Sequence, residues 1–285
     1  MNMRASIQSV FVISLPICFL LATSLHAATV DGMKIHSTVA GNGSRAVILV
    51  HGWTCDERTW KLQIPALSKD YRVITLDLPG HGQSEFPKDG KMSMDLFARA
   101  IEAVRKERKA DRVVLVGHSM GVAAIMQYAR LYPKRTVALV LVDGSVTFPP
   151  DSTIRERMLS FAARYADSLS VRRAGIEAMS IPTTSQAVKD QALAMVLSAR
   201  PATAVGAMEA LVDPANWKED VFAQPVLVVL SELGGDEGPE NDLNYMKIRF
   251  PNLDYTKLHA GHFLMLERPE EFNELLLTFL SKLKY

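Results

Sequence analysis

The stretch that decides the fold runs from residue 112 to residue 131 and reads Arg-Val-Val-Leu-Val-Gly-His-Ser-Met-Gly-Val-Ala-Ala-Ile-Met-Gln-Tyr-Ala-Arg-Leu. The β-branched run Arg112–Val116 does not alternate with polar residues, which predicts a strand buried on both faces. The mostly apolar run after it, Val122–Leu131, predicts a helix, which should begin at Ser119. Between them stands Gly117-His118-Ser119-Met120-Gly121, a G-x-S-x-G pattern whose serine occupies a strained strand-to-helix turn. The glycines leave space for the crowded backbone, so the turn lifts the hydroxyl clear of the sheet.

Five further short apolar runs predict strands of the same kind. They are Ala46–Val50, Tyr71–Leu76, Val137–Val142, Val226–Leu230 and Leu253–Leu258. A helical pattern begins at Met94, where apolar residues recur on one face, and a last helix is expected from Pro269, since proline suits the first turn. Strands that alternate with helices predict an α/β fold with a mostly parallel central sheet flanked by helices.

The length and composition suit one globular protein with an insertion. The 285 residues are 48% hydrophobic and 22% charged, and the formal net charge of +1 indicates no nucleic-acid partner, which usually needs a basic face. The interval 145–216 interrupts the alternation and predicts several short helices, which would form a cap over the carboxyl edge of the sheet. We therefore divide the chain into a first core part at 28–144, a helical cap at 145–216 and a second core part at 217–285.

The first 27 residues differ in character from the rest. Arg4 precedes an almost wholly apolar run, Val10–Leu21, and small and polar residues follow it, so residues 1–27 are interpreted as a secretory signal peptide cleaved near Ala27. We expect a periplasmic or secreted protein without stable membrane insertion after cleavage. Of the two cysteines, the mature chain would keep Cys55 alone and could form no internal disulfide.

A serine needs a base before it can act as a nucleophile, and His262 is the best candidate among the seven histidines. It lies in a loop after the last predicted strand and before the last helix, and His259 is its near rival. The loop after the strand Ala46–Val50 carries His51-Gly52-Trp53. The backbone N–H groups of Trp53 and Met120 are the expected pair of donors to a developing oxyanion.

With these motifs together, the sequence resembles the α/β-hydrolase superfamily over essentially the whole mature chain. The resemblance also rests on Asp77-Leu78-Pro79-Gly80-His81-Gly82-Gln83-Ser84 and on Gly261-His262-Phe263, which precedes Glu267-Arg268-Pro269-Glu270. It implies that the Asp77–Ser84 stretch is a structural loop. Relatives with an aspartate nucleophile are disfavoured, because the elbow residue here is Ser119.

The carboxylate that completes a triad stays open between two candidates. Family members commonly place it a few residues after the strand that matches Val226–Leu230, where Asp236 stands here, but this loop is about two residues longer than usual. Other relatives take it from the end of the preceding strand, the position of Asp143. We favour Asp143 because the loop after Leu230 does not match the usual acid motif, and Glu232 ranks third. Either carboxylate would orient the histidine and stabilise its charged form.

The resemblance implies a serine hydrolase that cleaves carboxylic esters, with a small-molecule ester as its partner. Flexible apolar residues of the cap would line the acyl pocket, namely Met158, Phe161, Met179, Met195 and Met208. The same residues could support a lactonase, a C–C bond hydrolase or a cofactor-free haloperoxidase, and the fold also occurs in non-catalytic ligand-binding proteins. No zinc spacing and no phosphate loop occurs, so no metal or other cofactor is expected. The oligomeric state stays open.

Overall fold

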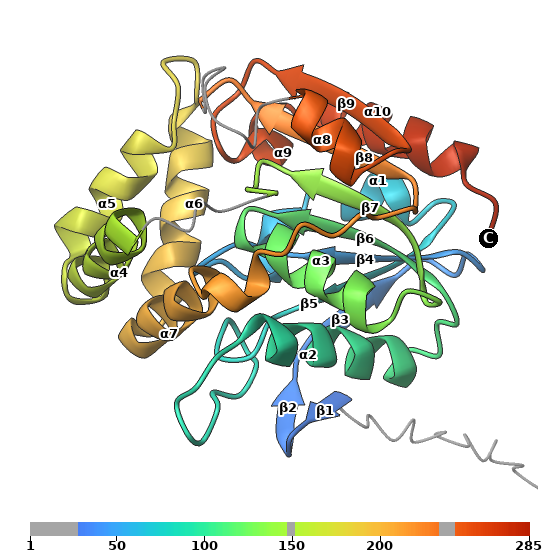
Figure 1. The fold of residues 1–285 in the computed structure, drawn as a ribbon. Helices are drawn as coiled ribbons and strands as arrows, with labels where there is room; N and C mark the ends of the chain where they lie inside the picture. Colours follow the sequence, from blue (N-terminus) through green and yellow to red (C-terminus); the bar gives the residue numbers. More distant parts are fainter. Residues whose placement is uncertain (1–27, 147–151, 234–242) are drawn as a thin grey trace, which may run out of the picture.

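The computed structural model of the chain describes residues 28–146, 152–233 and 243–285. Its centre is a seven-stranded sheet in the order β3-β5-β4-β6-β7-β8-β9, in which β3 pairs antiparallel with β5 and the other pairs are parallel (Figure 1). The strands are β3 (Ser37–Ala40), β4 (Ala46–Val50), β5 (Arg72–Leu76), β6 (Val113–His118), β7 (Thr136–Val142), β8 (Val226–Ser231) and β9 (Leu253–Leu258).

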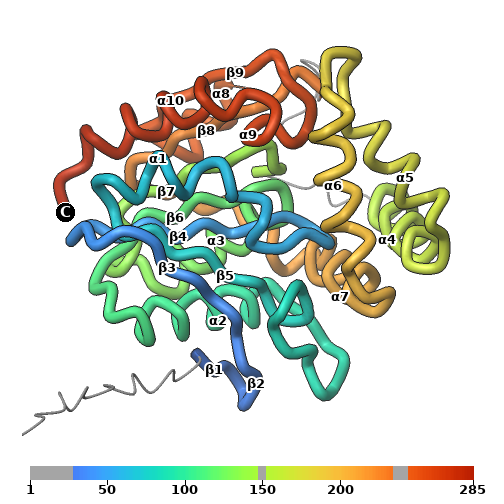
Figure 2. The backbone as a smooth tube through the Cα atoms, turned by 180° about the vertical axis from the view of Figure 1, so that it is seen from behind, coloured from blue at the N-terminus to red at the C-terminus, as the bar shows by residue number. Residues whose placement is uncertain are grey.

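Helices cover both faces of the sheet, and Figure 2 shows them from behind. One face carries α2 (Met94–Glu107), α3 (Met120–Leu131) and α8 (Leu243–Arg249), and the other carries α1 (Ile64–Leu67), α9 (Leu264–Glu267) and α10 (Pro269–Lys282). A separate two-stranded hairpin, β1 (Ala28–Val30) and β2 (Met33–Ile35), packs on α2.

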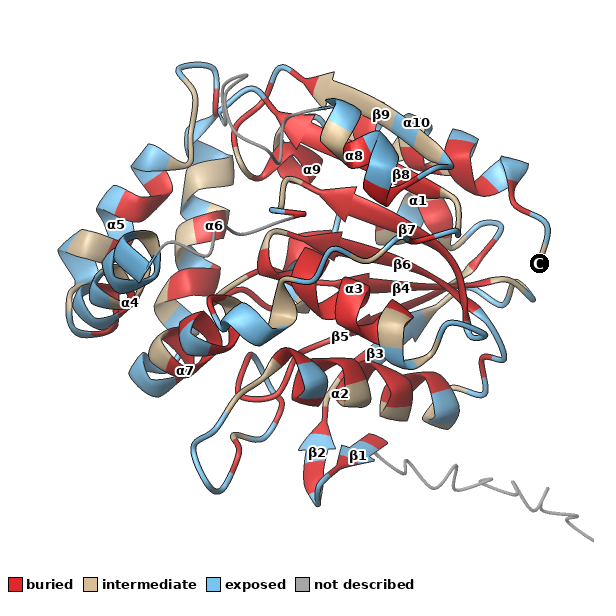
Figure 3. Cartoon of the chain, viewed as in Figure 1, coloured by how far each residue is buried: buried red, intermediate tan, exposed pale blue. Residues whose placement is uncertain are grey.

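The central strands are buried on both faces, as their unbroken apolar sequences predict (Figure 3). In β4, Ile48 belongs to the core under α2 and α3, whereas its neighbours Val47 and Leu49 belong to the core under α10. Successive side chains of a strand point to opposite faces. The sheet therefore separates two cores that share its strands.

The predicted fold class is confirmed, with small shifts of boundaries. All six predicted strands are present, and the helix expected at Ser119 begins one residue later, at Met120. A short helix, α9, separates His262 from the last helix. The sequence did not predict β1, β2 and β3, because each has only three or four residues, too few for a pattern of apolar residues to stand out.

The described part of the interval 145–216 consists of helices joined by short linkers and contains no strand. It contains α4 (Ser152–Asp167), α5 (Leu169–Ala178), α6 (Gln186–Ser198), α7 (Pro201–Leu211) and the 3-10 helix η2 (Pro214–Asn216). Figures 1 and 2 place these helices beyond the carboxyl ends of the parallel strands. Across the three described ranges, every helix is too short or too polar to cross a membrane.

A buried arginine joins three of these helices. Arg172 of α5 is 4% exposed and donates to four backbone carbonyls, two at the end of α4 (Tyr165 and Ala166) and two at the end of α6 (Val196 and Ala199), at 2.9–3.1 Å. The last carbonyls of a helix have no partner within the helix, and a cation there also interacts favourably with the helix dipole. Arg172 therefore ties α5 to the ends of α4 and α6.

Replacing Arg172 by Met should destabilise the chain by about 2–3 kcal/mol, because buried carbonyls lose their donors. Arg173→Met is the matched control, since Arg173 is exposed in the same helix and its loss should change the free energy of unfolding by less than about 0.5 kcal/mol. Urea unfolding measures both values, and equal effects of the two substitutions would contradict the role of Arg172.

Candidate active site

Ser119 lies on a strained turn between β6 and α3. Its φ is 54° and its ψ is −119°, a backbone conformation that residues other than glycine seldom adopt. The turn is crowded: a Cβ on Gly117 would lie 2.5 Å from the carbonyl oxygen of Gly121, and one on Gly121 would lie 2.6 Å from that of Val50. The glycines of the serine motif are therefore required by close backbone approach.

Asp143 and His262 form a short hydrogen bond next to this turn. His262 Nδ1 lies 2.6 Å from Asp143 Oδ2, while Asp143 Oδ1 accepts the N–H of Ser231 at 2.7 Å. An ionised carboxylate can only accept, so Nδ1 carries the proton and Nε2 of the neutral ring is left as a base. Burial raises the pKa of Asp143, but the hydrogen bond and charge of His262 and the Ser231 N–H outweigh it and hold that pKa below its usual range.

The other acid and base candidates lie elsewhere. Asp236 lies outside the described residues. Glu232 and His259 pair with each other, with Glu232 Oε2 2.6 Å from His259 Nδ1, and both side chains are at least half exposed. Of the two candidate carboxylates within the described residues, Asp143 and not Glu232 is the one that bonds to His262.

One of the two expected oxyanion donors follows Ser119 in the chain, and the other follows Gly52, which packs against the Ser119 turn. Met120 is the first residue of α3, so its N–H is among those that no carbonyl of the helix can accept. Trp53 lies in the loop after β4, and the preceding Gly52 packs against the nucleophile turn, because a Cβ on it would lie 3.0 Å from Ser119 Cβ. The loop closes on itself through a hydrogen bond from Cys55 N–H to the Gly52 carbonyl.

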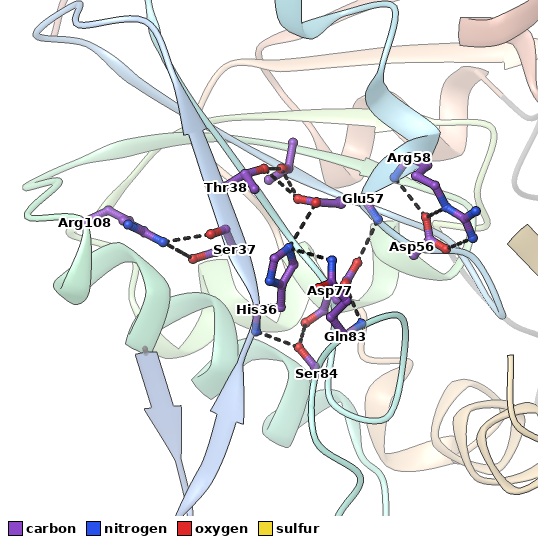
Figure 4. Close-up of polar contacts among 11 residues, drawn as sticks. His36, Ser37, Thr38, Asp56, Glu57, Arg58, Asp77, Gln83, Ser84 and Arg108 are labelled. Atoms are coloured by element: carbon purple, nitrogen blue, oxygen red, sulfur yellow. Dashed lines mark hydrogen bonds and ion pairs between the residues drawn. The ribbon is translucent and has the colours of Figure 1, made fainter. Parts of the chain in front are cut away.

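A polar network holds the far end of this loop (Figure 4). Asp77 accepts the backbone N–H groups of Glu57 and Gln83, both at 2.8 Å. The Glu57 carboxylate in turn contacts the His36 ring and accepts a hydrogen bond from the Thr38 hydroxyl of β3. Asp77 therefore fixes the loops after β4 and β5, in agreement with a structural role.

The helices of the 145–216 interval contact the site directly. Met179, at the end of α5, accepts the backbone N–H of His262 at 2.9 Å. The Trp53 indole donates to the Ala204 carbonyl of α7 at 2.8 Å, and its ring packs on Tyr165 of α4, with centroids 4.5 Å apart. Both the base loop and the loop after β4 are thus attached to these helices.

The methionines expected to line a pocket differ in burial. Met195 is 1% exposed and its sulfur accepts from Thr59 Oγ1, so it belongs to the core. Met208 is also buried, whereas Met158, Met179 and Phe161 are partly exposed. Cys55 is buried next to Trp53, and burial raises the pKa of its thiol to about 12, which keeps it neutral.

His118, inside the serine motif, was not singled out from the sequence. Its Nε2 donates to the His262 carbonyl at 2.9 Å, and the ring is 1% exposed. Burial, and next the proximity of His262, lower its pKa to about 3. Its place between Gly117 and Ser119 was the available signal, but sequence alone does not show which backbone atom a side chain meets.

Because the folded chain keeps His118 neutral, its free energy of unfolding should depend on pH. In the unfolded chain the imidazole binds a proton below about pH 6.5, whereas the folded ring does so only below about pH 3, so its contribution to stability is lost as the pH falls between these values. Across this window the free energy of unfolding of wild type should fall more steeply than that of His118→Gln, by up to about 1.4 kcal/mol per pH unit. Denaturant titrations at several pH values measure this, and parallel curves would contradict it.

Comparison with known proteins finds relatives of several activities. A curated relative from Pseudomonas putida, the dihydrolipoyllysine-residue acetyltransferase component of an acetoin cleaving system, is 26% identical over 86% of this chain, which spans 65% of that protein. A putative 2-succinyl-6-hydroxy-2,4-cyclohexadiene-1-carboxylate synthase from Bacillus subtilis is 25% identical over 89% of this chain and 97% of its own length.

Solved structures agree in fold. A thermophilic esterase from Thermogutta terrifontis superposes with a TM-score of 0.79 over 90% of this chain and 96% of its own, at 24% identity. Est816, an enzyme that degrades N-acyl homoserine lactones, gives 0.71 over 88% and 99%, at 26% identity. The model of the alpha/beta hydrolase family matches residues 47–275, which include Ser119, Asp143 and His262. The chain therefore belongs to the alpha/beta hydrolase family.

Proposed function

We propose that the chain is a serine hydrolase that cleaves carboxylic esters of small or medium hydrophobic substrates through an acyl-enzyme at Ser119. The observation that carries the proposal is the 2.6 Å bond between His262 and Asp143 beside the strained Ser119 turn. It leaves Nε2 of His262 as the base, in a loop that is hydrogen-bonded to His118, the residue before Ser119. Nucleophilic catalysis by serine requires a base oriented in this way.

The chemistry follows from these positions. His262 Nε2 takes the Ser119 proton as Oγ attacks the ester carbonyl, and the N–H groups of Trp53 and Met120 stabilise the oxyanion. The protonated His262 then gives that proton to the departing alcohol. A water molecule, deprotonated by the same nitrogen, attacks the acyl-enzyme and releases the acid and free Ser119. Asp143 stabilises the charge on His262 in both halves.

Apolar side chains around Trp53 support a hydrophobic acyl group. Phe161 and Tyr165 lie at centroid distances of 6.0 and 4.5 Å from the Trp53 ring, and Met158 and Leu159 pack on the neighbouring cluster. These residues come from α4, over the carboxyl edge of the sheet. Chain segments outside the sheet would thus set substrate size.

A lactone is the second candidate substrate, because it is a cyclic ester and follows the same steps. The 26% identity to the lactone-degrading Est816 favours it. We also propose that the protein acts in the periplasm or outside the cell, on the basis of residues 1–27, which lie outside the described residues.

The first test is hydrolysis of p-nitrophenyl esters with two to twelve acyl carbons. Wild type should be active and Ser119→Ala should lose activity on the order of 10⁶-fold, because the nucleophile is gone. Ser145→Ala, at an exposed serine, is the control and should keep full activity. If wild type neither cleaves any ester or lactone nor reacts with a fluorophosphonate, a ligand-binding protein without turnover replaces the proposal.

The acid is tested by Asp143→Asn and Asp236→Asn. Asp143→Asn should lower the turnover of an activated ester by at least about 10²-fold, because the amide no longer fixes the histidine tautomer. Asp236→Asn should retain turnover close to that of wild type. A large loss in Asp236→Asn alone would transfer the role to Asp236, and a loss in neither would remove both from the mechanism.

A further inference from the structure

The ring of His118 lies where three loops of the candidate site meet. His118 is the last residue of β6 and precedes Ser119 directly. Its Nδ1 faces the loop after β4, because a Cβ on Gly52 would lie 3.1 Å from this nitrogen. Its Nε2 faces the base loop, 2.9 Å from the His262 carbonyl oxygen. One buried side chain therefore contacts all three loops.

The His262 carbonyl determines the direction of its hydrogen bond with His118. A carbonyl oxygen can only accept, so His118 Nε2 carries the proton and donates. The other nitrogen, Nδ1, is buried and has no hydrogen-bond partner within residues 28–146, 152–233 and 243–285. The ring packs against His262 and Phe263, with centroids 4.6 and 5.4 Å away, and meets the edge of Trp60 at 6.5 Å. Its one strong polar contact is thus directed at the backbone of the base.

The backbone of His262 is held on both sides. Its N–H donates to the Met179 carbonyl, and its own carbonyl accepts from His118. The bond from Nδ1 to Asp143 orients the ring, but it does not fix how far the ring lies from Ser119. That separation depends on the backbone, and a displacement of about 1 Å in a catalytic group can cost on the order of 10²-fold in rate.

We propose that His118 is a positioning residue, which fixes the backbone of His262 against the turn that carries Ser119. The proposal rests on the proposed function of Ser119 and His262 and adds a residue outside the triad and the oxyanion donors. It assigns the role to the Nε2–H donor and not to the bulk of the ring.

The neutral state of His118 suits this role. The titratable groups that act on it are His262, Asp143 and His51, and burial keeps the ring uncharged at neutral pH. It can therefore hold the His262 carbonyl without placing a second positive charge beside the imidazolium that forms when His262 accepts the serine proton. A lysine or arginine in its place would oppose that charge.

Two variants separate the donor from the ring. His118→Phe keeps a ring of similar size but removes the donor and leaves the His262 carbonyl without it. His118→Gln places an amide nitrogen close to the position of Nε2. On p-nitrophenyl butyrate, His118→Phe should lower kcat roughly tenfold, with KM changed by less than about twofold. His118→Gln should recover most of this loss, to within about threefold of wild type.

A spectroscopic signal tests positioning without turnover. The proton shared by His262 Nδ1 and Asp143 should give a downfield ¹H NMR resonance, since the bond is only 2.6 Å long. In His118→Phe this resonance should broaden or shift upfield, and His118→Gln should restore it. Thermal unfolding of each variant confirms that the measurements are made on folded protein.

The results decide between distinct explanations. Wild-type kcat and an unchanged resonance in folded His118→Phe would overturn the proposal. Equal losses in His118→Phe and His118→Gln would overturn it too, because the shape of the ring and not the donor would then matter. If wild-type Ser119 fails to react with a fluorophosphonate, the proposed function fails instead, while the NMR comparison still reports whether His118 fixes the base.

Discussion

The backbone of Ser119 is the constraint on which the site depends. A residue other than glycine at φ 54° and ψ −119° costs on the order of 1–3 kcal/mol, which the surrounding structure has to offset. Ser119 N–H donates to the Val142 carbonyl, and its own carbonyl accepts from Val122. These contacts anchor the turn to β7 on one side and to α3 on the other. The strain is thus tolerated because backbone hydrogen bonds fix both sides of the turn at the carboxyl end of a buried central strand.

The register of the sheet then brings distant residues together. Val50 of β4 pairs with Gly117 of β6, and His118 of β6 pairs with Val142 of β7. Residues just after these positions therefore lie side by side at the carboxyl edge. The loop after β4, the serine turn and Asp143 become neighbours although they are far apart along the chain. Parallel pairing produces this convergence, since the parallel strands β4 to β9 all end at the same edge.

The sequence could predict those features that depend on the type and spacing of residues along the chain. Short apolar runs identified six strands, five of them largely buried and β9 only partly so, and the spacing around Ser119 identified the turn. The acid stayed open between Asp143 and Asp236, because the loops after two adjacent strands end at the same edge and sequence does not reveal which carboxylate faces the histidine. Contacts with backbone atoms could not be predicted. Every residue has a backbone carbonyl, so nothing in the sequence marks Met179 as the residue whose carbonyl accepts from His262.

The helices outside the sheet are attached both to the loop that carries His262 and to Trp53 in the loop after β4. His262 N–H bonds to Met179, and Glu267 accepts both the N–H of Gly261 and the hydroxyl of Thr184, which belongs to the linker after α5. The same helical interval supplies Tyr165 and Ala204, which hold Trp53. Packed elements move together, because interiors are dense and deform little. The helical interval therefore holds both the base loop and Trp53, so a shift of these helices would move both.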